Sequence, residues 1–119
     1  AFGRRGEWDF VVEAVELAMA CGAPVKVVWS RADDLRHDFY RPATANRLAA
    51  RLDDARGLQL LTHRIAAPSI ARRRSPEMLE RGHDFLMTQG SSDHPYSIEH
   101  QLIDYQEVDL GVPVGFWRS

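Results

Sequence analysis

The chain has 119 residues, of which 45% are apolar, and this length allows one domain with a genuine core but not two. Its 15 basic and 17 acidic side chains leave a formal net charge of −2, which predicts no attraction to nucleic acid or to an anionic membrane. A single cysteine, Cys21, excludes an internal disulfide framework, and we expect it to be buried as a small apolar side chain. No apolar run approaches the roughly 18 residues of a membrane span.

The first third of the chain predicts a long helix over residues 8–21. Its apolar side chains recur at the spacing of one buried helical stripe, which is formed by Trp8, Val11, Val12, Val15, Ala18 and Met19. Gly22 is placed to end the helix, and Pro24 prevents its continuation. Residues 25–30 are rich in β-branched side chains and predict a strand, followed by a charged turn over 31–36.

Residues 43–55 give two conflicting indications. Their alanine, leucine and arginine content favours a helix. However, Pro42 precedes them, and residues 53–57 have the composition of a hairpin turn that leads into a strand over 58–65. Local composition alone leaves a helix and a strand open.

The remaining elements are shorter. Residues 68–74 predict a loop, and Ser75-Pro76 predicts the start of a short helix that ends near Gly82. A polar loop over 89–95 and a strand over 105–110 follow, and 111–115 form a bend. Together the elements predict one α+β domain over 1–119, in which the long N-terminal helix packs on a small, mostly antiparallel sheet.

Two places could meet a cofactor. Gly3, just before the predicted helix, would let the backbone and the free helix amides approach an anionic ligand. Arg118 follows Phe116 and Trp117 and could present its planar donor fork to a phosphate or a pterin carbonyl. Taken alone, these residues are better explained as an ordinary loop and a surface arginine than as ligand contacts.

The other titratable residues predict no catalytic or metal site. His37 and Asp38 are adjacent, so on an extended chain they point to opposite faces, and a structural role is favoured. The other histidines lack the spacing of metal ligands. We expect the pairs 83–84 and 93–94 to make turn hydrogen bonds and the arginines at 72–74 to lie in a solvated loop.

The order of several segments carries more information than any one of them. The segments are Phe2-Gly3-Arg4-Arg5, Asp9–Val15, Gly22–Arg31, Arg36–Ala43 and Gly111–Ser119. In this order they resemble the molybdopterin-binding large subunit of molybdenum hydroxylases, of the isoquinoline 1-oxidoreductase beta-subunit type within the group of xanthine dehydrogenases and aldehyde oxidases. The resemblance is strongest over 2–48 and 105–119, and it favours a strand over 43–55 that pairs with 58–66.

The resemblance implies cofactor-binding roles for Phe2, Gly3 and Arg118. In the family the Phe-Gly backbone passes beside the molybdenum, and an arginine in a comparable loop lies near the cofactor. The glycines that precede this motif in the family are missing here. The glutamate that serves as catalytic base lies outside this sequence, so no catalytic residue is expected in it.

The resemblance also implies a reaction and partners. The intact enzyme would use molybdopterin to hydroxylate an aldehyde carbon or a carbon of an N-heteroaromatic substrate, and electrons would leave through iron–sulfur clusters on a partner small subunit. The apolar-aromatic ends predict an interior fragment that alone is inactive, binds no cofactor and self-associates through Phe116 and Trp117. A cytoplasmic and a periplasmic bacterial location both stay open. The alternative function is a free-standing α+β module that binds a ligand or a protein and has no redox role.

Overall fold

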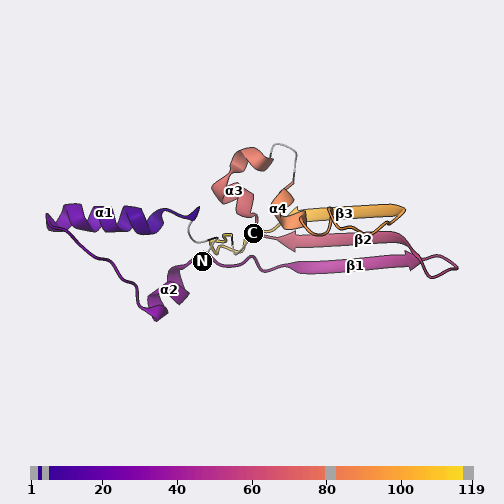
Figure 1. The fold of residues 1–119 in the computed structure, drawn as a ribbon, viewed down its shortest axis with the longest axis horizontal. Coiled ribbons are helices and arrows are strands. Elements are labelled where there is room, and N and C mark those ends of the chain that lie inside the picture. The colour runs from indigo at the N-terminus through magenta and orange to yellow at the C-terminus, as the bar shows by residue number, and fades with distance from the viewer. Residues whose placement is uncertain (1–2, 4–5, 80–82, 117–119) are drawn as a thin grey trace. The chain divides into compact units, whose positions relative to one another are not determined.

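The computed structural model describes residues 3, 6–79 and 83–116, and these fall into two units (Figure 1). The first unit comprises Ala1–Arg41 with Gly115–Ser119, and the second comprises Pro42–Val114. Helices and a three-stranded sheet confirm the expected α+β class. The expected single domain and the packing of the long helix on the sheet stay predictions.

The long helix of the first unit, α1, spans Asp9–Cys21 and confirms the helix expected from the apolar spacing. It ends as expected at Gly22, whose φ of 63° is a left-handed conformation that glycine adopts without steric cost. Trp8 occupies the position before the helix and makes no side-chain cap. The N-terminal amides of α1 are therefore not capped by that side chain.

The predicted burial of the α1 stripe is wrong within the described residues. Val12 and Val15 are each 52% exposed, Met19 is 78% exposed, and no residue of α1 is buried. Cys21, expected inside, is also exposed. The spacing of apolar residues specifies a helix, but burial requires other residues packed closely against it, and the described residues of this unit bury no residue of α1.

Residues 25–30 form no strand, although their composition predicted one. The segment is extended but has no described partner strand with which to form a ladder. The indole Nε1 of Trp29 instead donates to a carboxylate oxygen of Glu13 on α1 at 2.8 Å. The strand prediction failed because β-branched residues favour an extended backbone without supplying a neighbour for it.

The expected charged turn over 31–36 is a helix, α2, which spans Arg31–His37. Ser30 and Asp33 form a reciprocal capping box, in which each side chain bonds the backbone N–H of the other residue. This pair satisfies two amides that would otherwise lack partners at the helix start. The capping residues are present in the sequence, although the charged composition of 31–36 predicted a turn.

The second unit contains a mixed three-stranded sheet in the order β1-β2-β3 (Figure 1). Strand β1 (Ala45–Leu52) pairs antiparallel with β2 (Leu58–Ala67), and β3 (His100–Glu107) pairs parallel with β2. The strand expected over 105–110 corresponds to β3, which begins and ends earlier in the chain than expected. The antiparallel hairpin resolves the conflict over 43–55 in favour of a strand.

A tight turn closes the β1–β2 hairpin. Asp53 and Gly57 bond each other twice: the Asp53 amide donates to the Gly57 carbonyl at 2.9 Å, and the Gly57 amide donates to the Asp53 carboxylate at 2.7 Å. Arg56 adopts a φ of 65°, which is unusual for a residue with a Cβ. These local bonds hold the helix-favouring segment 43–55 in pairing with the strand that follows it, so turn chemistry overrides helix propensity here.

Three short helical segments connect β2 to β3. They are α3 (Ile70–Arg74), the 3₁₀ helix η2 (Pro76–Leu79) and α4 (Phe85–Thr88). The loop expected over 68–74 is therefore partly helical, and η2 confirms the helical start expected at Ser75-Pro76; its predicted end near Gly82 lies outside the described residues. The described apolar core gathers where these helices meet the sheet, and it consists of Ile65, Ala67, Ile70, Ala71 and Val114.

Candidate functional site

The structure describes one of the three residues expected to bind the cofactor. Gly3 lies in a turn before α1, in which its carbonyl accepts a hydrogen bond from the Gly6 amide at 3.1 Å. Phe2 and Arg118 lie outside the described residues. The cofactor-binding roles expected for these three residues stay predictions.

Glu7 lies between this turn and α1 and is only 7% exposed. It lies two residues before the first residue of α1, where a carboxylate is stabilised by the partial positive charge of a helix start.

The second unit contains a buried polar cluster centred on Asp84. This carboxylate is fully buried and accepts hydrogen bonds from the Ser69 hydroxyl at 2.6 Å, the Ala71 amide at 3.0 Å and the Leu86 amide at 2.9 Å. Asp84 is the N-cap of α4, and Ser69 is the N-cap of α3, whose Arg72 amide it accepts at 3.0 Å. One carboxylate thus satisfies amides at the start of two helices.

The turn hydrogen bond expected at residues 83–84 is confirmed, because the Asp84 carboxylate accepts from the Leu86 amide. This carboxylate is fully buried. The pair 93–94 also behaves as expected, because the Gly90 amide donates to Asp93 and the Tyr96 amide donates to Nδ1 of His94 at 3.2 Å. The sequence identified the capping residue Asp84 but not Ser69. The signal for Ser69 is its place directly after Pro68 and before the helix-forming residues 70–74.

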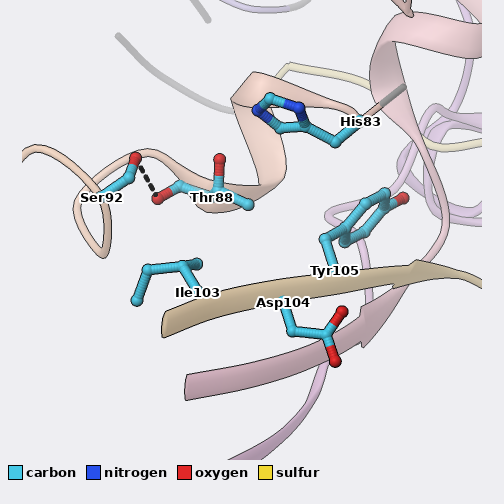
Figure 2. Close-up of a pocket in the computed structure, with 6 residues that line it drawn as sticks. All are labelled: His83, Thr88, Ser92, Ile103, Asp104 and Tyr105. Atoms are coloured by element: carbon cyan, nitrogen blue, oxygen red, sulfur yellow. Dashed lines mark hydrogen bonds between the residues drawn. The ribbon is translucent and has the colours of Figure 1, made fainter. Parts of the chain in front are cut away.

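A hollow of about 370 Å³ lies beside this cluster, between α4 and β3 (Figure 2). Its lining residues are His83, Thr88, Ser92, Ile103, Asp104 and Tyr105. Ile103 and Tyr105 stand on the face of β3 toward α4, while the Asp104 side chain projects from the other side of the strand (Figure 2). The Asp104 carboxylate lies 3.2 Å from Nε of Arg64.

Tyr105 connects the hollow to the buried cluster. Its hydroxyl donates to the Ala67 carbonyl at 3.0 Å. Partial burial raises the pKa of the Tyr105 phenol to about 12, and the negative charges of Asp84 and Glu107 add to this rise. The phenol is therefore neutral at physiological pH and acts as a fixed hydrogen-bond donor to the backbone.

The hydroxyl groups of the hollow are committed to the backbone. The Thr88 and Ser92 hydroxyls each donate to a carbonyl of the same short segment, at 3.2 Å to Phe85 and 3.2 Å to Thr88 respectively. The hydroxyls of Thr88, Ser92 and Tyr105 thus donate to backbone carbonyls, and none of these three bonds joins a hydroxyl to a histidine as in an activated nucleophile. This arrangement stabilises the fold around α3 and α4 and provides no recognisable catalytic group.

The arginines at 72–74 are exposed to solvent as expected, but they belong to the helix α3 and not to a loop. The Arg72 guanidinium binds both carboxylate oxygens of Glu107 on β3, with 2.6 Å between Nη2 and Oε2. Nε of Arg73 donates to the Val114 carbonyl at 2.9 Å. Both side chains therefore link α3 to the last part of the unit.

The part of the chain that the structure describes contains no group of three histidine, cysteine, aspartate or glutamate side chains arranged to hold a metal ion. The helices of that part include none that is long and apolar enough to cross a membrane.

Comparison with known proteins identifies one informative relative. No family model matches the chain, and no solved structure is significantly similar to it. The chain is 42% identical over 77 residues to isoquinoline 1-oxidoreductase subunit beta from Brevundimonas diminuta. The match covers 64% of this chain but only 10% of the relative, so the chain spans about a tenth of the length of the curated protein it matches. The resemblance inferred from the order of the sequence segments is thereby confirmed: this chain is similar to a short stretch of an isoquinoline 1-oxidoreductase beta subunit.

Proposed function

We propose that the chain is part of the large, molybdopterin-binding subunit of a molybdenum-dependent oxidoreductase. One observation carries the proposal, the 42% identity over 77 residues to isoquinoline 1-oxidoreductase subunit beta. The intact enzyme would hydroxylate a carbon of an N-heteroaromatic compound or an aldehyde carbon. A partner small subunit with iron–sulfur clusters would carry the electrons away.

In this proposal Phe2, Gly3 and Arg118 meet the cofactor. The fit can be judged at Gly3, where a residue without a Cβ lies in a turn closed by the Gly6 amide, so a ligand could approach the backbone closely. The bound molybdopterin would supply the redox chemistry, while these residues contribute binding and orientation.

Arg118 is proposed to act through the shape of its guanidinium. A guanidinium presents a planar fork of donors that can bond two acceptors at once, whereas an ammonium is a single point of charge. In the intact subunit, we expect Arg118→Lys to lower the pterin content of the purified enzyme about tenfold. The matched variant Arg56→Lys, in the hairpin turn, should leave the pterin content unchanged. Equal pterin contents in the two variants would remove Arg118 from the site.

We further propose that the chain in isolation binds no molybdopterin and has no turnover. The proposed contacts number only three residues, and none of them is a catalytic acid or base. Molybdenum and pterin analysis of the purified chain tests this, with intact enzyme as the positive control. Stoichiometric cofactor on the isolated chain would show that it holds a complete site and would overturn this part of the proposal.

The alternative, a free-standing α+β binding module, makes a different prediction about the gene. If the chain is part of the large subunit, its reading frame continues for several hundred residues around the 119 residues. A reading frame confined to these residues would favour the module. Sequencing of the flanking DNA decides between the two.

A further inference from the structure

Strand β1 (Ala45–Leu52) forms one edge of the sheet (Figure 1). All eight of its residues are exposed, and within the described chain its only strand neighbour is β2. Its outer row of backbone N–H and C=O groups therefore faces no described strand. Such an edge is a template for pairing with another extended chain.

The two faces of β1 differ in chemistry. Arg47 and Arg51 lie on one face, because alternate residues of a strand share a face. Leu48 lies on the opposite face and is 61% exposed. Leu52 is 57% exposed and follows a register shift in the pairing of β1 with β2. On one face, a strand added at this edge would lie beside Arg47 and Arg51 with Ala49 between them. On the other face it would lie beside Leu48 and Ala50.

The arginines of β1 lack acidic partners among the described residues. The Arg51 guanidinium bonds the neutral amide oxygen of Gln59, at 3.0 Å from Nε and 2.6 Å from Nη2. No ion pair is recorded for Arg47. By contrast, Arg64 on the neighbouring strand pairs with Asp104 on β3 at 3.2 Å.

The opposite edge of the sheet differs in this respect. The acidic side chains of β3, Asp104 and Glu107, are already paired with Arg64 and Arg72. The Gln101 side chain of β3 also binds the Ser91 carbonyl at 2.7 Å. On the described strands, the arginines without an acidic partner therefore lie on β1.

We propose that the β1 edge binds an extended polypeptide segment in which acidic and apolar side chains alternate. Acidic side chains would lie opposite Arg47 and Arg51, and apolar ones would lie on the other face beside Leu48. A second copy of β1 fits less well, because it brings arginines close to arginines. The proposal rests on this edge alone and does not depend on the assignment to an oxidoreductase.

Amide NMR spectra of the chain test the proposal. The probe is a capped peptide of alternating glutamate and valine with the length of β1, and the control peptide replaces glutamate by lysine. We expect the glutamate peptide to shift the amide signals of Ala45–Leu52 more than those of His100–Glu107 and to bind about tenfold more tightly than the lysine peptide. Binding should weaken as salt is added.

A matched pair of variants locates the site. Arg47→Glu/Arg51→Glu should weaken binding of the glutamate peptide about tenfold, whereas Arg31→Glu/Arg36→Glu, which changes the net charge equally on the exposed helix α2, should not. Equal binding of the two peptides, shifts centred on β3, or equal effects of the two double variants would overturn the proposal. So would sedimentation that shows the free chain to dimerise through β1.

Discussion

At the scale of single residues, Asp84 is the most consequential side chain of the described structure. It is fully buried, and its carboxylate accepts three hydrogen bonds that start two helices and hold Ser69. In Asp84→Asn, the side-chain N–H groups of the asparagine would face groups that are themselves hydrogen-bond donors. We expect a loss of about 3 kcal/mol in the free energy of unfolding, because buried donors to a charged acceptor would be left unsatisfied.

Urea denaturation followed through the amide signals of β2 measures this loss. Asp104→Asn is the matched control, since it removes an exposed ion pair with Arg64 and should change stability little. If the two variants unfold at the same urea concentration, the buried carboxylate does not have the role assigned to it.

Tyr105 predicts a pH dependence at the same scale. Partial burial, followed by the charges of Asp84 and Glu107, raises the pKa of its phenol from 10.0 to about 12. Because the folded state favours the protonated phenol, this contribution to stability is complete below pH 10 and is lost as pH rises from 10 to 12. Stability measured across this range should fall less in Tyr105→Phe than in the native chain. Equal slopes for the two proteins would contradict the assignment.

At the scale of elements, the β1–β2 hairpin carries a residue in a conformation that its type disfavours. Arg56 has a φ of 65°, and a Cβ makes that left-handed conformation costly. We expect Arg56→Gly to raise the free energy of unfolding by about 1 kcal/mol, whereas Arg56→Ala, which keeps the Cβ, should not. Denaturation in urea distinguishes them. A less stable glycine variant would show that the Arg56 side chain contributes more than its backbone strain costs.

The elements also show why local sequence signals succeeded in some places and failed in others. The helix over 9–21 and its end at Gly22 were predictable because the spacing of apolar residues and a C-terminal glycine are local properties. The strand expected over 25–30 did not form, because a strand needs a neighbour that the segment itself cannot specify. For residues 43–55 composition pointed to a helix, and the bonds between Asp53 and Gly57 show how the turn decides for a strand.

At the scale of the whole molecule, the described core is unevenly distributed. All five buried apolar residues belong to the second unit, and the described residues of the first unit include none. A helix of 13 residues without a packed face is marginally stable in water. We therefore expect the amides of α1 to exchange with solvent much faster than those of β2.

Hydrogen exchange followed by NMR provides the comparison. The inner amides of β2, which pairs with strands on both sides, serve as the protected reference. Equal protection in α1 and β2 would show that α1 gains stability from contacts other than those described. The exposed Val12, Val15 and Met19 make α1 the part of the chain that most needs a further surface.

The sequence by itself determined the long helix and its end, the α+β class, and the similarity to an isoquinoline 1-oxidoreductase beta subunit. These depend on local spacing and on the order of segments, both of which are readable along the chain. Only the tertiary structure decided that β3 lies parallel to β2, that Asp84 caps two helices at once and that the α1 stripe is exposed. The physical reason is the same in each case: pairing and burial are properties of two segments, and the pattern of one segment does not name its partner.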